Sequence, residues 1–212
     1  EKHRYKSPDG TEIPITIVKN KKKFRADGDN MTILTAYGGY GIVFPAHFSP
    51  DVIFFLENGG VFAFAHIRGG GELGSDWYRQ GKGLNKHHSV DDFIAAAEFL
   101  VNNKYSTPAK LAITGSSHGE FIVGAAMIKR PDLFKVAIPK VGLFDLVSTL
   151  VQPQEFGAVD DSTGINYRLG LSPLHNLKNG TTYPSAFIIT AENDDRVPPF
   201  HSLKFTSALQ NI

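Results

Sequence analysis

Short apolar runs of strand length alternate along this chain with longer segments whose apolar residues recur at helical spacing. The short runs predict strands over residues 12–18, 31–36, 61–67, 110–114, 136–141 and 183–190. The longer segments predict helices over residues 50–58, 90–103, 118–127 and 198–209. This alternation predicts an α/β fold, a doubly wound and mostly parallel sheet with helices on both faces.

Charged residues add detail to one predicted helix and to one connection between predicted strands. Asp91 and Asp92 stand in the expected first turn of the helix 90–103, where acidic side chains favour the helix dipole. The basic run 19–25 separates the first two predicted strands, and we interpret it as a solvated hairpin loop.

Composition narrows the classes of function. The chain has 212 residues and a formal charge of +1, which gives no electrostatic case for binding nucleic acid or an anionic membrane. Without cysteine it has no disulfide, thiolate metal site or cysteine nucleophile. No apolar stretch reaches the roughly 18 residues of a membrane span, and the opening residues are no signal peptide and resemble the interior of a longer protein. We expect a single domain over residues 1–212, located in the cytoplasm, without metal or cofactor.

The strand 110–114 runs into Gly115-Ser-Ser117-His-Gly119 and then into a predicted helix. A turn this tight forces strained backbone on Ser117 and requires near absence of side chains two residues to either side, where both residues are glycine. Ser117 would then stand above the sheet as a nucleophile, with the backbone N–H of His118 forming half of an oxyanion hole. An ordinary Gly/Ser loop is the alternative, and the strand and helix on either side disfavour it.

A serine nucleophile needs an acid and a base. Asp194 follows the strand 183–190 and is our choice of acid; alternatively, Asp194 or Asp195 caps the helix predicted from residue 198. Asp145 is the rival acid. Ligands of such sheets bind beyond the carboxyl ends of the strands, where all these residues fall together with Tyr37.

No histidine occupies the expected position on a loop after a further strand. The eight histidines are His3, His47, His66, His87, His88, His118, His175 and His201. We expect His201 to be a surface or packing residue within the last helix, and the side chain of His118 to point away from Ser117. The chain stops inside a predicted helix, so we expect a C-terminally incomplete fold and an incomplete triad.

Six further sequence motifs are spread along almost the whole chain. They are Tyr37-Gly-Gly-Tyr40, His66-Ile-Arg-Gly-Gly-Gly-Glu72-Leu-Gly74, Asp91-Asp-Phe93, Arg130-Pro-Asp-Leu-Phe134, Ser172-Pro-Leu-His-Asn176 and Asp194-Asp-Arg-Val197. In this order they resemble the prolyl oligopeptidase family, serine peptidases of the α/β-hydrolase fold. The resemblance implies that Ser117 is the nucleophile and Asp194 the acid of the triad. It also implies that the Tyr37 hydroxyl and the His118 N–H form the oxyanion hole and that Arg196 holds a substrate carbonyl. By the same resemblance, the walls of the substrate pocket are formed by Tyr40, Leu143 and Val197.

Simpler roles remain open for three of these motifs. Tyr37 is alternatively a core aromatic residue, and Arg196 alternatively a partner of Asp195. The run from Arg68 to Gly71 resembles a phosphate loop but lacks its Gly-Lys-Ser/Thr ending, so we expect Arg68 to be a structural ion-pair residue.

The chain also departs from the family pattern. Glu120 replaces a small residue after the nucleophile, where its bulk is expected to crowd the site. The family stacks a tryptophan against proline in the segment between Asp145 and Ser172, whereas the only tryptophan here is Trp77. The amino-terminal propeller and the histidine segment of the family are absent from residues 1–212.

The leading hypothesis is a serine peptidase domain that hydrolyses oligopeptides through an acyl-enzyme on Ser117, with preference for proline left open. An esterase or acylaminoacyl-peptidase relative is the second hypothesis, and a non-catalytic domain the third, because the triad histidine is absent. We also expect the chain to associate with itself or with a missing C-terminal segment, because an incomplete sheet exposes apolar surface.

Overall fold

The computed structural model describes residues 1–148, 153–158 and 162–212. Within them, seven strands form one mixed sheet in the order β1-β2-β4-β3-β5-β6-β7. The strands are β1 Lys2–Lys6, β2 Glu12–Lys19, β3 Thr32–Thr35, β4 Val61–Ala65, β5 Leu111–Ser116, β6 Val136–Lys140 and β7 Ser185–Ala186. The pairs β1–β2 and β2–β4 are antiparallel, and every later pair is parallel.

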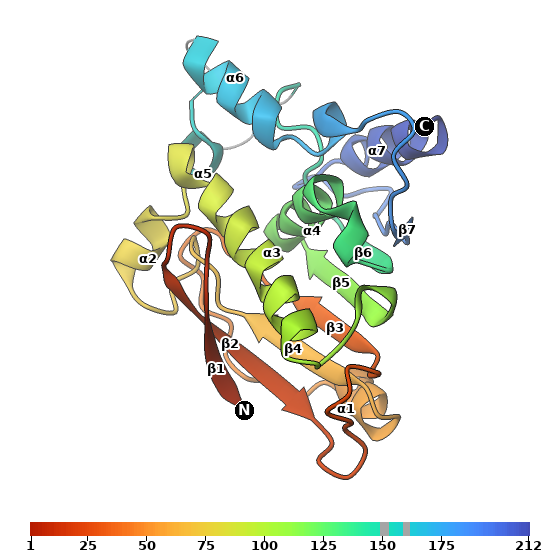
Figure 1. Ribbon diagram of the computed structural model, residues 1–212. Helices are drawn as coiled ribbons and strands as arrows, with labels where there is room; N and C mark the ends of the chain where they lie inside the picture. Colours follow the sequence, from red (N-terminus) through yellow and green to blue (C-terminus); the bar gives the residue numbers. More distant parts are fainter. Residues whose placement is uncertain (149–152, 159–161) are drawn as a thin grey trace.

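The helices are α1 Pro50–Glu57, α2 Ser75–Arg79, α3 His87–Asn102, α4 His118–Lys129, α5 Pro153–Phe156, α6 Ser162–Leu171 and α7 Phe200–Gln210. Among the described residues, none of them is long and apolar enough to cross a membrane. Side chains of the sheet alternate between its two faces, as strand geometry requires. On the face covered by α3 and α4, alternate residues of β3, β4 and β5 are fully buried (Figure 1).

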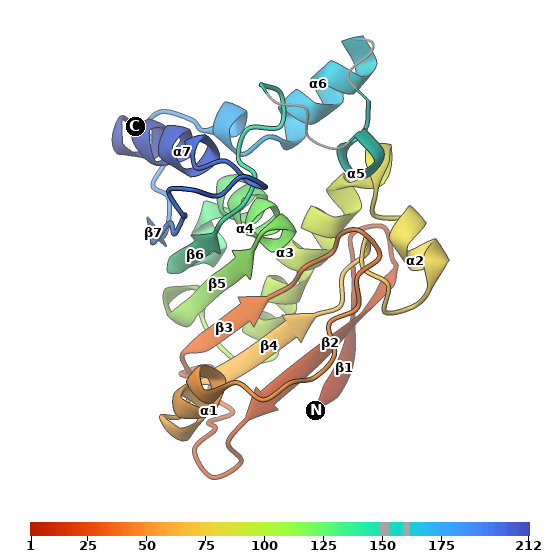
Figure 2. The same cartoon turned by 180° about the vertical axis from the view of Figure 1, so that it is seen from behind.

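The opposite face of the sheet is largely open. Figure 2 shows β2, β3 and β4 on this side with α1 and the loop that precedes it lying against them, and Phe44 of this loop packs 6.1 Å from the ring of Phe64. The residues that face it are partly exposed: Ile33, Phe62, Phe64, Ala112 and Ile138. Phe187, just after β7, is 65% exposed.

Most of the predicted elements are present, with four corrections. The loop 19–25 is no hairpin loop, because β2 pairs with β4 instead of β3. The helix predicted from residue 90 begins at His87, so Asp91 and Asp92 lie beyond its first turn. The strand predicted over 183–190 is reduced to β7 and a single bridge between Ile189 and Lys140. Strand β1 and helices α2, α5 and α6 were not predicted.

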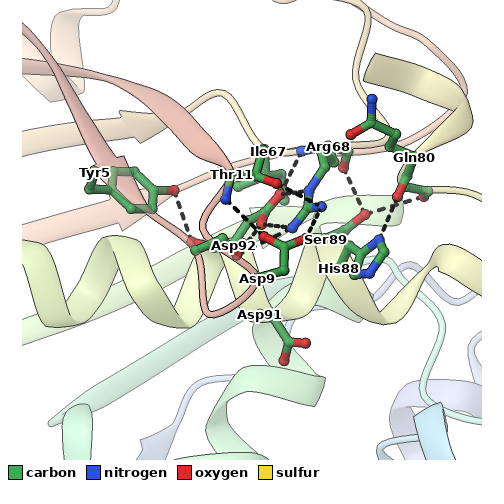
Figure 3. A network of polar contacts seen from close by, with 12 residues as sticks. Tyr5, Asp9, Thr11, Ile67, Arg68, Gln80, His88, Ser89, Asp91 and Asp92 are labelled. Carbon is green, nitrogen blue, oxygen red and sulfur yellow. Dashed lines mark hydrogen bonds and ion pairs between the residues drawn. The ribbon is translucent and has the colours of Figure 1, made fainter. Parts of the chain in front are cut away.

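Arg68 forms the buried polar centre of the N-terminal half, as expected for a structural ion-pair residue. Its Nε and Nη2 atoms donate to Asp92 at 2.9 and 2.6 Å, and Nη1 donates to Asp9 at 2.5 Å. Ser89 donates to the Arg68 carbonyl at 2.7 Å. Figure 3 shows Asp92 pointing toward Arg68 and Asp91 pointing away from it. The β1–β2 turn, α3 and the loop after β4 therefore meet at one guanidinium group.

Candidate active site

The chain turns sharply at Ser117, between β5 and α4. Ser117 has φ 55° and ψ −120°, a strained conformation for a residue with a side chain. The two glycines of the motif allow the close approach that this turn needs. A Cβ atom on Gly115 would lie 2.3 Å from the Gly119 carbonyl oxygen, and one on Gly119 would lie 2.7 Å from the Ala36 carbonyl oxygen. The sequence therefore folds here into the elbow expected for a nucleophile.

His118 begins α4 directly after the serine, so its backbone N–H lies at the N-terminus of a helix. Its side chain is buried, and the ring lies against Gly39 and within 3.3 Å of Lys86 Nζ. Burial, followed by the nearby charge of Lys86, holds the pKa of His118 well below its ordinary value. The imidazole is therefore neutral and engaged elsewhere, so only the backbone of His118 is suited to an oxyanion hole.

Tyr37 follows β3 and is half-buried, which does not fit the alternative of a core aromatic residue. Its ring packs 4.9 Å from that of Phe44 and 5.7 Å from that of His118. Burial raises the pKa of Tyr37, whereas the hydroxyl of Ser117 and the charge of Arg196 lower it. The contact with the His118 ring places Tyr37 beside the residue that follows Ser117.

Asp194 lies in that loop. Its Oδ1 accepts hydrogen bonds from the backbone N–H groups of Arg196 and Val197, at 3.0 and 2.9 Å. The N–H of Val197 is the main cause that lowers the pKa of Asp194. Helix α7 starts only at Phe200, so Asp194 shapes its own turn and does not cap the helix. Arg196 is exposed, and within the described part of the chain no ion pair joins it to Asp195.

The rival acid, Asp145, is committed to holding α7. It is fully buried, pairs with Lys204 at 2.9 Å and accepts hydrogen bonds from the N–H groups of Val147 and Ser148. Hydrogen bonds from Ser148, Lys204 and Val147 hold the pKa of Asp145 well below its ordinary value, against the opposing effect of burial. The Asp145 N–H donates to His201 Nδ1 at 3.2 Å. Burial lowers the pKa of His201 to about 4, and this histidine is the packing residue that we expected.

The three residues expected to wall the pocket also follow strands. Tyr40 comes after β3 with φ 58°, Leu143 comes after β6 and packs against the core, and Val197 is half-buried after β7. Trp77 lies elsewhere, because its Nε1 donates to the carbonyls of His66 and Ile67. The segment expected to carry the family's tryptophan lies partly outside the described residues.

The sequence did not predict one ion pair near the elbow. Lys86 and Glu155 form a fully buried ion pair beside His118, and no local pattern relates two residues 69 positions apart. Glu120 is also fully buried, and neither of its carboxylate oxygens has a hydrogen-bond partner within residues 1–148, 153–158 and 162–212. None of the eight histidines, all of them in the described part of the chain, makes a hydrogen bond with Ser117. No three metal-ligating side chains gather anywhere in the described ranges.

The comparisons with known proteins agree with this geometry. A model of the prolyl oligopeptidase family matches residues 46–212. The chain is 43% identical to a prolyl endopeptidase of Elizabethkingia meningoseptica, over 97% of this chain and 30% of that protein. It is 39% identical to a dual function macrocyclase-peptidase of Amanita bisporigera, over 97% of this chain and 29% of that protein.

Solved structures resemble the chain over its whole length. A structure from a study of two prolyl endopeptidases superposes with a TM-score of 0.96 at 38% identity, over 100% of this chain and 32% of that one. A post-proline cleaving enzyme from Rickettsia typhi superposes with a TM-score of 0.95 at 31% identity, over 99% and 31% of the two chains. The chain thus spans about a third of the length of these proteins, and its sheet has the expected α/β-hydrolase architecture. It belongs to the prolyl oligopeptidase family.

Proposed function

We propose that this chain forms the larger part of the catalytic domain of a serine peptidase, which hydrolyses peptide bonds of oligopeptides through an acyl-enzyme on Ser117. The observation that carries the proposal is the strained elbow at Ser117, flanked by the Tyr37 phenol and the His118 N–H. Strain of this kind persists only where surrounding contacts hold it, and it is typical of functional sites.

The site supports nucleophilic attack by Ser117 Oγ on a peptide carbonyl carbon. The carbonyl oxygen becomes negatively charged, and the Tyr37 hydroxyl and the His118 N–H stabilise that charge because both donate hydrogen bonds toward it. A base takes the proton of the Ser117 hydroxyl and gives it to the amine as the C–N bond breaks, and water then hydrolyses the acyl-enzyme. Asp194, with its lowered pKa, stays ionised and can orient an imidazole base. We propose that this base comes from a segment outside residues 1–212, since His118 and His201 are buried and engaged elsewhere.

Cleavage after proline is the substrate preference that we propose. The relatives that support it are named prolyl endopeptidase and post-proline cleaving enzyme. In this chain Tyr40, Leu143 and Val197 would enclose the proline ring, and the exposed guanidinium of Arg196 would hold a substrate backbone carbonyl. The preference is tested by comparing cleavage of two peptides that differ only in proline or alanine before the scissile bond. Equal rates for the two peptides would contradict it.

The catalytic proposal is tested by labelling the full-length protein, which includes the segment proposed to supply the imidazole base, with a fluorophosphonate, and by reading the product as intact mass. We expect one label per chain, which Ser117→Ala abolishes and Ser116→Ala preserves. Ser116 is a suitable control because it is the exposed neighbour of the elbow serine. Labelling of both variants would contradict the role of Ser117. Absence of labelling in the unaltered full-length protein would favour the second candidate, a non-catalytic domain, which rests on the observation that no histidine of the described residues makes a hydrogen bond with Ser117.

We also propose that the open face of the sheet associates with a second copy or with a further segment of the protein. Its support is apolar exposure: Phe187, just after β7, is 65% exposed, and Phe48 and Phe54, in the loop before α1 and in α1, are 77% and 71% exposed. A monodisperse monomer in light scattering, with a cooperative melt at high temperature, would contradict this. A cytoplasmic location remains a prediction, which imaging of the tagged protein would check.

A further inference from the structure

Lys86 is a lysine with no access to solvent, placed in the turn between the Gly83–Asn85 3-10 helix and α3. Its ammonium group pairs with Glu155 Oε1 and donates to the Gly38 carbonyl oxygen at 3.1 Å. It also lies 3.3 Å from the Nε2 atom of His118. A buried charge is costly unless it is paired and hydrogen-bonded, so these partners account for its burial.

Glu155 completes the arrangement from the other side. It lies on α5, and its Oε2 accepts hydrogen bonds from the Tyr40 N–H and the Tyr78 hydroxyl, both at 3.2 Å. The pair therefore makes hydrogen bonds with one backbone stretch at two points. Lys86 donates to the carbonyl of Gly38, and Glu155 accepts from the amide of Tyr40.

The stretch that is held carries two proposed site residues. Tyr37 precedes it and Tyr40 ends it, and both Gly38 and Tyr40 have positive φ, at 65° and 58°. Such a conformation is unfavourable for a tyrosine and needs external contacts to persist. Beyond the pair, it is fixed by a hydrogen bond from the Gly41 N–H to Gly69 and by the His118 ring.

We propose that Lys86 and Glu155 are positioning residues, which hold residues 37–40 so that the Tyr37 hydroxyl is aimed at the oxyanion and the Tyr40 ring at the substrate. The inference rests on the proposed function of Ser117. Because Glu155 lies on α5, the pair also ties the segment after β6 to the oxyanion hole, and the position of α5 becomes a condition for activity. A misplacement of about 1 Å in such a site typically costs about 100-fold in rate.

The test compares Lys86→Met with the double variant Lys86→Met/Glu155→Gln. The single variant leaves a buried carboxylate without its cation, so both its urea midpoint and its labelling rate should fall. In the double variant the glutamine still accepts from Tyr40 and Tyr78, and no unpaired charge remains, so the midpoint should recover. The Gly38 carbonyl still lacks its donor, so the fluorophosphonate labelling rate should stay at least about 10-fold below that of the unaltered chain. Recovery of the rate together with the midpoint would overturn the proposal.

Ile17→Ala serves as the control for loss of stability alone. Ile17 is fully buried in β2, and its truncation lowers stability without touching residues 37–40. We expect its labelling rate to stay within about twofold of the unaltered chain, since its effect is confined to the core. If Ile17→Ala slows labelling as much as Lys86→Met, the effect of the pair is general destabilisation and the proposal fails.

Hydrogen exchange separates this inference from the proposed function. The amides of residues 37–42 should exchange faster in both Lys86 variants than in the unaltered chain and in Ile17→Ala, because the loop has lost an anchor. This readout does not need a reactive serine. Faster exchange in a chain that does not label would uphold the positioning role and contradict only the catalytic proposal, whereas unchanged exchange would overturn the positioning role.

Discussion

Glu120 gives the sharpest prediction about stability. It lies in the first turn of α4 with no exposed surface, and no described residue makes a hydrogen bond of normal geometry with either carboxylate oxygen. The loop after β6 is so close that a Cβ atom on Gly142 would lie 2.2 Å from the Cβ of Glu120. Burial raises the pKa of Glu120 to about 8, although the nearby Gly142 backbone and Ser202 hydroxyl act to lower it. The side chain is therefore neutral in the folded protein at pH 7.

The direction of the pH effect follows from this shift. In the unfolded chain Glu120 has its ordinary pKa of 4.5, so between pH 4.5 and about 8 the folded state binds more protons than the unfolded state. Stability then falls as the pH rises through this window and is unaffected by Glu120 below it. At about 1.4 kcal/mol per pKa unit, the loss sums to about 5 kcal/mol by pH 8.

Glu120→Gln removes the titrating group while keeping nearly the same shape. We expect the variant to be more stable than the unaltered chain at pH 8, by about 5 kcal/mol less a constant for burying an amide. The difference between the two chains should shrink steadily toward pH 4.5, because protonated glutamate and glutamine are both neutral.

The assay is urea unfolding of both chains at intervals between pH 4.5 and 8.5, with the difference in unfolding free energy plotted against pH. Other titrating groups cancel in this difference. Glu192→Gln, at an exposed position, is the matched control and should give a flat line. A flat line for Glu120→Gln, or a variant that becomes relatively less stable as the pH rises, would refute the reasoning.

Three further outcomes can be checked with single substitutions. Arg68→Met should lower the free energy of unfolding, measured by urea denaturation, by about 3–5 kcal/mol, because it leaves Asp92 buried and unpaired. Its control is Lys129→Met, which breaks an exposed ion pair and should lower that free energy by at most about 1 kcal/mol. Tyr37→Phe should lower the labelling rate about 100- to 1000-fold with little change in melting temperature, since it removes one oxyanion donor. Gly119→Ala should lower the melting temperature and abolish labelling, because the added methyl group meets a backbone oxygen at 2.7 Å.

The sequence was most informative where structure depends on neighbouring residues. The elbow needs a small residue two positions before and two positions after Ser117. Gly115 and Gly119 meet this need, so five consecutive residues were enough to predict the elbow. Strands β3, β4, β5 and β6 were predicted for a similar reason, because buried parallel strands are continuous apolar runs. The position of the candidate site at their carboxyl ends then follows from a general rule of α/β folds, whereas their pairing order was not predicted.

What the sequence did not reveal depends on distant partners. Strand β1 is mostly polar and buries only Tyr5, so it forms by pairing with β2 and not through its own pattern. Asp92 resembled an acid at a helix start, yet its partner Arg68 lies 24 positions away. Nothing near Glu155 in the sequence indicates that it would meet Lys86. The sequence shows that charged residues capable of forming such pairs are present, but which of them come into contact is decided by the tertiary fold.

The Arg68 cluster makes the first ten residues part of the support of the proposed catalytic site, although they lie far from Ser117 in the sequence. Asp9 in the β1–β2 turn holds the guanidinium of Arg68, and the next residue, Gly69, accepts the hydrogen bond that anchors Gly41. A shortened version of the protein that starts after this turn would therefore lose more than an edge strand. We expect it to loosen the loop that carries Tyr37, so a boundary chosen only to keep Ser117 would remove a support of the proposed oxyanion hole.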